Sequence, residues 1–114
     1  MRQNLIILFG SHATGRTRAG SDVDVAVLSK KPLSLKEKGL VSEESAKQLG
    51  VSEDSIDIID LSVADPLLQH EVAENGKLLS GDKDDFDLFR LLAWKRYQGT
   101  AKFRRARERA LGVA

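Results

Sequence analysis

Residues 8–28 of the chain read LFGSHATGRTRAGSDVDVAVL. Two apolar runs in this stretch flank a loop that is rich in glycine and arginine. The pair Gly10–Ser11 follows the first run, and Asp22 and Asp24 stand at the head of the second. Because a β-strand points successive side chains to opposite faces, the two carboxylates are expected on one face of a strand.

Two neighbouring carboxylates repel each other and raise each other's pKa unless a cation lies between them. A Mg²⁺ ion suits this pattern, since it prefers one or two carboxylates together with phosphate oxygens. Gly10 leaves room for a phosphate to approach the backbone, and Ser11 adds a hydroxyl and an N–H donor. Together these features predict a site for a nucleoside triphosphate.

A third carboxylate, Asp57, lies in the later apolar stretch IDIIDL at 56–61. If that stretch forms a strand beside 23–28, Asp57 would share the metals. Two metals can activate a hydroxyl nucleophile and stabilise the departing oxygen of an in-line displacement. The apolar spacing of 56–61 alone does not exclude a helix.

Strands and helices are expected to alternate along the chain. The continuous apolar run at 4–9 is typical of a buried strand, and the β-branched run at 23–28 is a second. Ser34 and Glu37 have the spacing of a capping box, although Gly39 and Ser42 suggest a break within the helix that follows. The expected helices cover 34–49, 65–75 and 86–110, the last with a kink at Gly99.

Length and composition predict one soluble domain spanning 1–114, with a core at about 4–80 and a helical stretch at about 86–110. The 114 residues are 41% apolar and include no cysteine. The apolar run near Met1 is too short for a signal sequence or a membrane span, so a cytoplasmic protein is expected.

The charge is uneven although the net charge is only +1. Residues 95–114 carry seven Lys or Arg and one acid, Glu108. This basic segment is either a solvated helix or a surface for an acidic partner. A nucleic acid is not the expected substrate, because the segment has little aromatic character beyond Phe103 and no recognisable nucleic-acid motif.

The Gly-Ser pair, ten intervening residues and the Asp-x-Asp motif resemble the signature of DNA polymerase β-type nucleotidyltransferases. With IDIIDL and the later LLQHEVAENGKLL, the chain resembles the small MNT (minimal nucleotidyltransferase) proteins over about 5–79. The resemblance implies an α+β or α/β fold, a compact mixed β-sheet flanked by helices.

The resemblance also implies roles for particular residues. Gly10 and Ser11 would hold the β- and γ-phosphates of ATP, and Asp22 and Asp24 would bind both Mg²⁺ ions. Asp57 would bind the catalytic metal and help to activate the acceptor hydroxyl. The family pattern favours Asp57 over its neighbour Asp60 (not counted among the site residues), because the third carboxylate falls in the first half of the strand.

The reaction implied by the resemblance is transfer of AMP from ATP to a hydroxyl, with release of pyrophosphate. MNT proteins are often antitoxins that adenylylate a tyrosine of a HEPN-type toxin. The alternative is a catalytically silent module that binds a nucleotide or neutralises a partner by forming a complex.

Several other residues are expected to have structural or solvent-exposed positions rather than functional roles. His12 is expected to be a loop histidine rather than a contact to phosphate. Arg16 and Arg18 are expected to be solvated rather than to attract a triphosphate by long-range charge. His70 is expected to have a structural role. Trp94 and Tyr97 are expected in the core or at an interface. Apolar residues surround more than one face of the helix from Phe86, which predicts a homodimer or a helical partner. They are Leu88, Phe89, Leu91, Leu92 and Trp94.

Overall fold

The computed structural model describes residues 4–10 and 23–112. The two strands on either side of the loop between Gly10 and Asp22 pair with each other in the centre of the sheet. Strand β1 (Leu5–Phe9) runs antiparallel to β2 (Val23–Leu28), so that Phe9 lies opposite Asp24. The predicted bounds of β2 are confirmed, and β1 begins one residue later than expected.

The other two strands complete a mixed sheet. Strand β3 (Ile56–Asp60) runs parallel to β2, and β4 (Lys77–Ser80) runs antiparallel to β1 with a register shift between Ile6 and Ile7. The order across the sheet is β3-β2-β1-β4. The predicted mixed sheet is thereby confirmed, and 56–60 is a strand rather than a helix.

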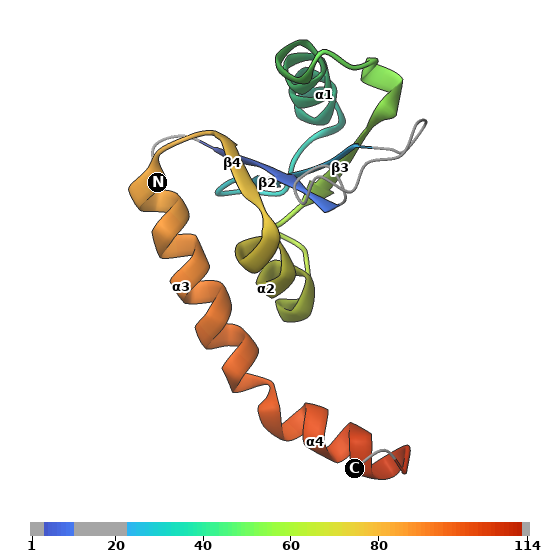
Figure 1. Ribbon diagram of the computed structural model, residues 1–114, viewed down its shortest axis with the longest axis vertical. Coiled ribbons are helices and arrows are strands. Elements are labelled where there is room, and N and C mark those ends of the chain that lie inside the picture. The colour runs from blue at the N-terminus through green and yellow to red at the C-terminus, as the bar shows by residue number, and fades with distance from the viewer. Residues whose placement is uncertain (1–3, 11–22, 113–114) are drawn as a thin grey trace.

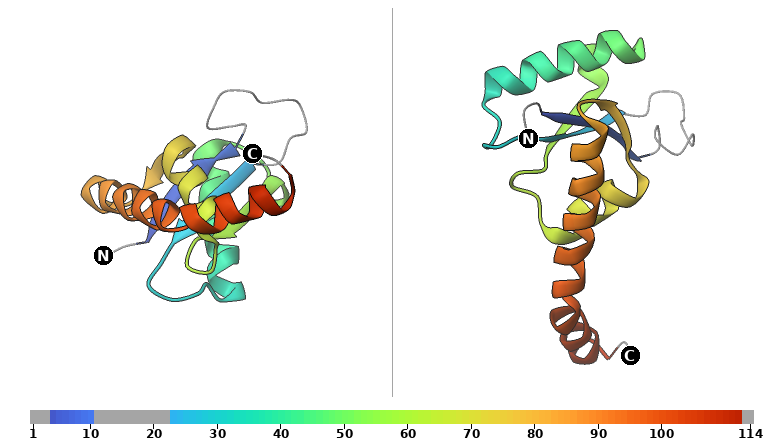
Figure 2. Two further views of the ribbon diagram at one scale, coloured as in Figure 1. Left: turned by 90° about the horizontal axis from the view of Figure 1, so that it is seen from below. Right: turned by 90° about the vertical axis from the view of Figure 1, so that its left-hand side faces the viewer.

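Helices cover both faces of this sheet (Figures 1 and 2). The helix at 35–49 packs on one face and the helices at 66–75 and 83–99 pack on the other, while the helix at 101–110 extends away from the sheet. No helix in the described part of the chain is long and apolar enough to cross a membrane. The helices are α1 (Leu35–Leu49), the short η2 (Glu53–Ser55), α2 (Pro66–Asn75), α3 (Lys83–Gly99) and α4 (Ala101–Ala110).

The alternation of side chains along the strands produces two apolar layers. One layer joins Leu5, Ile7 and Ala26 to residues of α2 and α3, among them the fully buried Val72 and Ala93. The other layer packs against α1 and contains Val23, Val25, Val27 and Leu33, with Ile58 and Leu49 at its margin. The sheet is therefore buried on both faces, as the continuous apolar runs indicate.

Helix α1 begins as predicted and continues where a break was expected. The Ser34 hydroxyl accepts a hydrogen bond from the Glu37 amide, and the Glu37 carboxylate accepts one from the Ser34 amide. The expected break near Gly39 and Ser42 is wrong. A lone glycine in a helix costs only about 1 kcal/mol, and packing of Ala46 and Leu49 against the sheet outweighs this cost.

The long C-terminal helix is divided where the sequence predicted. Helix α3 ends at Gly99 and α4 begins at Ala101, with Thr100 between them. Phe86, Phe89 and Ala93 are buried on one face of α3, as their spacing indicates. Trp94 is not a core residue, because it is 48% exposed.

Candidate active site

Two of the predicted carboxylates lie side by side on adjacent strands. Asp24 of β2 and Asp57 of β3 are register partners in the parallel pair. Neighbouring strands are about 4.8 Å apart, so the two side chains are close enough to share one ion. The prediction that Asp57 lies beside Asp24 is confirmed.

Both carboxylates also point to the same face of the sheet. Asp24 precedes Ala26 by two residues, and Asp57 precedes Ile59 by two, and both of these apolar residues pack in the layer beneath α2 and α3. Side chains two residues apart in a strand share a face. Asp57 is exposed and Asp24 is partly exposed, so the pair is accessible to a solvent-borne ligand.

Gly10 lies next to this pair, and the structure gives a second reason for a glycine at this position. Its φ is +80°, a left-handed conformation that glycine adopts without strain. A β-carbon at position 10 would also lie 2.5 Å from Oδ2 of Asp24. The absent side chain therefore makes room for the Asp24 carboxylate, in addition to any phosphate that approaches the backbone.

Asp60 has a structural role on the opposite face of β3. Its Oδ2 accepts a hydrogen bond from the Leu33 amide at 2.8 Å, and its Oδ1 accepts bonds from the Ser62 hydroxyl and amide at 2.6 and 3.0 Å. Partial burial opposes its ionisation. The Ser62 and Leu33 hydrogen bonds and the charge of Lys38 outweigh that effect and lower the pKa of Asp60.

Asp60 therefore differs from Asp57 in two ways: it lies on the other face of β3 from Asp24, and its carboxylate accepts hydrogen bonds from Leu33 and Ser62. The resemblance favours Asp57 over Asp60, and this difference of face and of hydrogen bonding supports that choice.

The remaining predicted site residues, Ser11 and Asp22, lie outside the described residues, as do His12, Arg16 and Arg18. Within 4–10 and 23–112, no group of three His, Asp or Glu side chains could hold a metal ion. Asp24 and Asp57 supply two hard oxygen donors on one face, which fits a Mg²⁺ ion that completes its shell with phosphate oxygens and water.

His70 and Tyr97 form a structural joint between α2 and the end of α3. Their rings stack with centroids 4.0 Å apart and planes 4° from parallel. The Arg104 guanidinium lies 3.9 Å from the Tyr97 ring centroid and donates hydrogen bonds to the Tyr97 hydroxyl and carbonyl. The structural interpretation of His70 is consistent with this packing, and Arg104 fixes the start of α4.

Comparison with known proteins adds to this geometry. The family model described as polymerase beta, nucleotidyltransferase, matches residues 2–88. The chain belongs to this family. The match includes β1, β2, β3 and the Asp24–Asp57 pair, so the predicted resemblance and the predicted fold are both confirmed.

Two relatives of this nucleotidyltransferase are each named protein adenylyltransferase MntA. The protein from Shewanella oneidensis is 36% identical over 95 residues, which are 82% of this chain and 66% of the relative. The protein from Aphanizomenon flos-aquae is 38% identical over 93 residues, which are 75% of this chain and 62% of the relative. The matched region thus spans just under two thirds of each relative.

Two solved structures contain chains with the same fold. One, described as a toxin-antitoxin with AMP-PNP, has a TM-score of 0.76 and 31% identity, and the match covers 94% of this chain and 84% of the other. The second contains the tri-AMPylated Shewanella oneidensis HEPN toxin in complex with MNT antitoxin. Its TM-score is 0.70 at 28% identity, and the match covers 97% of this chain and 85% of the other.

Proposed function

We propose that this protein is a Mg²⁺-dependent nucleotidyltransferase that transfers AMP from ATP to a hydroxyl group of a protein. The observation that carries this proposal is the pairing of Asp24 with Asp57 on one accessible face of the sheet, next to a glycine that has no room for a side chain. Membership of the nucleotidyltransferase family supports the class of reaction.

The nucleotide donor is proposed from a structural relative. A chain of the same fold belongs to a toxin-antitoxin structure with AMP-PNP, which is an analogue of ATP. In this chain the β- and γ-phosphates would lie at Gly10 and Ser11. Two Mg²⁺ ions would be held by Asp22, Asp24 and Asp57, and they would neutralise charge on the phosphates when bound.

The acceptor is proposed to be a tyrosine of a HEPN-type toxin, which would make this protein an antitoxin. Two relatives share the name protein adenylyltransferase, and a structure of similar fold holds an AMPylated HEPN toxin together with an MNT antitoxin. A protein acceptor also suits the geometry, because the exposed Asp57 lies where a large partner can reach it.

The chain's own residues would act by orientation and by charge. The acceptor oxygen forms a bond to the α-phosphorus of ATP, the bond from that phosphorus to the bridging oxygen breaks, and pyrophosphate leaves. Asp57, on the more exposed strand, would orient the acceptor hydroxyl and favour loss of its proton. Asp24, fixed beside Gly10, would set the position of the triphosphate relative to that hydroxyl.

The proposal is tested by incubating the full chain with ATP, Mg²⁺ and a purified HEPN-type partner, and then measuring the intact mass of the partner. The expected result is a partner heavier by one or more AMP units, and a partner tyrosine changed to phenylalanine should lose a unit. The Asp57→Asn variant should give no such increase, whereas the matched variant Asp87→Asn, altered at an exposed position of α3, should behave like the wild type.

An unmodified partner that nevertheless forms a stable complex with the chain would overturn the transferase proposal. The catalytically silent binding module would then account for the protein.

A further inference from the structure

Helix α3 carries an exposed apolar stripe with opposite charges at its two ends. Residues three and four apart in a helix lie on one face. Acidic side chains stand at the start of the stripe, leucines in the middle and basic side chains at the end. In order they are Asp84, Asp85, Leu88, Leu91, Leu92, Lys95 and Arg96.

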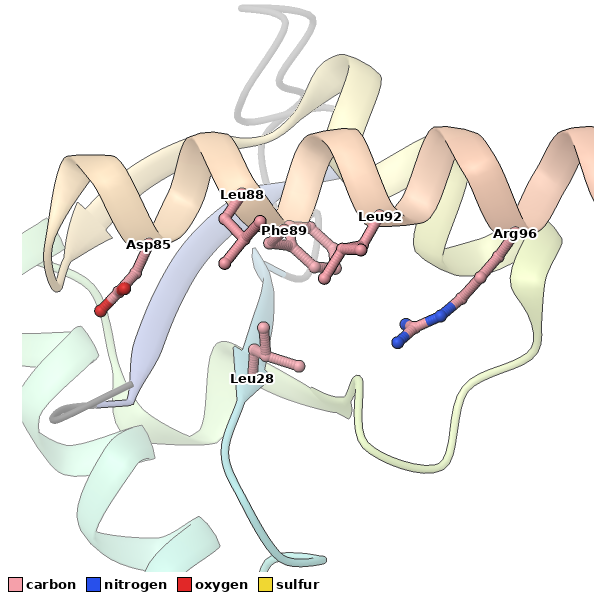
Figure 3. A pocket seen from close by; sticks show the side chains of 6 residues that line it. All are labelled: Leu28, Asp85, Leu88, Phe89, Leu92 and Arg96. Atoms are coloured by element: carbon pink, nitrogen blue, oxygen red, sulfur yellow. The ribbon is translucent and has the colours of Figure 1, made fainter.

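This face, which we call the α3 stripe, remains uncovered in the single chain. Leu88, Leu91 and Leu92 are 52%, 50% and 38% exposed. Leu88 and Leu92 stand at the border between the exposed side of α3 and its buried side, because they also line a groove against Leu28 (Figure 3). The three leucines lie within two turns of one helix and so form one continuous apolar patch, and such patches can mark interaction sites.

A groove runs along one edge of the α3 stripe, between α3 and the end of β2 (Figure 3). Its volume is about 200 Å³. Leu28 faces Leu88, Phe89 and Leu92 across it, while Asp85 and Arg96 stand towards its two ends. The groove therefore has an apolar centre, one acidic end and one basic end.

The charge order makes the α3 stripe complementary to itself in the antiparallel direction. Let a second α3 run the opposite way, with the two-fold axis at the level of residue 90. Asp85 of each copy then faces Lys95 of the other. Asp84 faces Arg96, whose guanidinium already donates a hydrogen bond to Oε1 of Gln69 at 2.9 Å in the single chain. Leu88 of each copy faces Leu92 of the other, so the charged residues face opposite charges and the leucines face leucines.

We propose that the α3 stripe is the contact between two copies of this chain, packed as an antiparallel α3–α3 pair. Such a two-fold contact uses the same patch on both subunits and closes on itself. Within the described residues neither Asp85 nor Lys95 has an ion pair in the single chain, so both are available to the second copy.

Helix-dipole stabilisation explains part of the pattern but not all of it. Acidic residues in the first turn and basic residues in the last turn stabilise a helix by themselves. That effect gives no reason for leucines on the exposed surface between the charges or for a groove beside them. The contact between the two copies accounts for both the charges and the leucines between them.

The size of the contact predicts a reversible dimer. Stable interfaces bury about 800 Å² on each partner, and one pair of α3 helices presents fewer than five turns apiece. The dimer should therefore dissociate on dilution, and its strength should depend on the charge pairs at the two ends.

Sedimentation equilibrium of the full chain over a wide concentration range tests the proposal. The weight-average mass should rise from 12.5 kDa towards twice that value as the concentration increases. Asp85→Lys alone and Lys95→Glu alone should each weaken the dimer about tenfold or more, because each places two like-charge pairs in the contact. An equimolar mixture of the two variants should recover dimerisation, because each altered residue then faces an opposite charge.

A matched pair of leucine variants tests the apolar centre. Leu88→Gln should weaken the dimer, whereas Leu40→Gln on α1, at a leucine that is 57% exposed on the other side of the sheet, should not. Circular dichroism confirms that each variant remains folded.

A chain that stays monomeric at every concentration would overturn the proposal, as would a mixture of charge variants that fails to recover dimerisation. If the chain is monomeric and Leu88→Gln instead weakens binding to a HEPN-type partner, the α3 stripe belongs to that partner. These measurements need neither ATP nor transfer, so they are independent of the proposed enzymatic function.

Discussion

The position of the Asp24 carboxylate depends on the absence of a side chain at Gly10. Gly10 combines a φ of +80° with a position at which a β-carbon would lie 2.5 Å from Oδ2 of Asp24. The sequence indicated that glycine was needed here for the approach of a phosphate. It did not indicate contact with Asp24, because that contact depends on β1 pairing with β2.

Changing Gly10→Ala should displace the Asp24 carboxylate and weaken binding of Mg²⁺–ATP at least about tenfold, since the metal loses a positioned ligand. The left-handed backbone should add a loss of stability of about 1–2 kcal/mol. Calorimetric titration and urea unfolding measure the two effects.

Gly50→Ala is the matched control for Gly10→Ala. Gly50 has a φ of +70°, but no atom lies within 4 Å of the place that a β-carbon would occupy there. The Gly50→Ala variant should lose similar stability and retain affinity for Mg²⁺–ATP. Equal affinities of wild type and Gly10→Ala would contradict the role given to Gly10.

Asp60 should make the stability of the protein depend on pH in the acid range. Its pKa is lower in the folded chain than in the unfolded chain, so its contribution is complete above the ordinary Asp pKa of about 3.9 and is lost as the pH falls through the folded value. Asp60→Asn should cost about 1–2 kcal/mol at pH 7, because one oxygen that accepts hydrogen bonds from Leu33 or Ser62 becomes a donor.

Thermal unfolding of wild type and Asp60→Asn between pH 7 and pH 3 measures this dependence. The difference in stability between wild type and Asp60→Asn should narrow once the pH falls below about 4. A gap that stays constant over the whole range would show that the charge of Asp60 is not what stabilises the Leu33 segment.

Among the helices and strands, α1 shows how tertiary packing overrides a local signal. Gly39 indicated a break, yet the helix continues through it to Leu49. Gly39 is exposed, and a β-carbon there would have no neighbour within 4 Å, so nothing in the fold needs a glycine at this position.

Gly39→Ala should therefore raise the free energy of unfolding by about 0.5–1 kcal/mol, because alanine restricts the unfolded chain and favours the helix. Gly50→Ala at the end of the same helix should lower it, because Gly50 is the left-handed C-cap. Urea denaturation of both variants measures the difference. A destabilised Gly39→Ala would mean that α1 does bend at this position.

Elements with strong local signals were predictable, and one with a weak signal was missed. The capping box of α1, the Asp65 cap of α2 and the interruption after Gly99 all have short-range causes. Strand β4 has only four residues, Lys77–Ser80, and exists by pairing with β1 at the edge of the sheet. Such a pairing across many residues leaves little local pattern.

In the molecule as a whole, topology assembles the site. Asp24 and Asp57 are far apart in sequence, and they become neighbours because β3 returns parallel to β2 after α1 crosses over. The spacing of Gly10, Ser11, Asp22 and Asp24 could be interpreted from sequence because it spans one hairpin. Asp57 and Asp60 occupy opposite faces of one strand, and the sequence does not show which of the two faces lies on the same side of the sheet as Asp24. That depends on the pairing of β3 with β2.

The α3 stripe also emerges only from the complete fold. The sequence predicted more apolar surface on the last long helix than one sheet needs, and Trp94 and three leucines are indeed exposed. The antiparallel complementarity of its charges required knowledge of which face α3 turns towards the sheet.

The Asp24–Asp57 pair is proposed to be the metal-binding centre for AMP transfer, and one kinetic measurement addresses it. This is the initial rate at which AMP is incorporated into a HEPN-type partner, measured across a Mg²⁺ titration for Asp24→Asn, Asp57→Asn and the control Asp87→Asn. We predict that each site variant lowers the rate by at least about 10³-fold and that Asp87→Asn retains the wild-type rate and Mg²⁺ dependence. Site variants with the wild-type rate and the wild-type Mg²⁺ dependence would contradict the assignment of this pair.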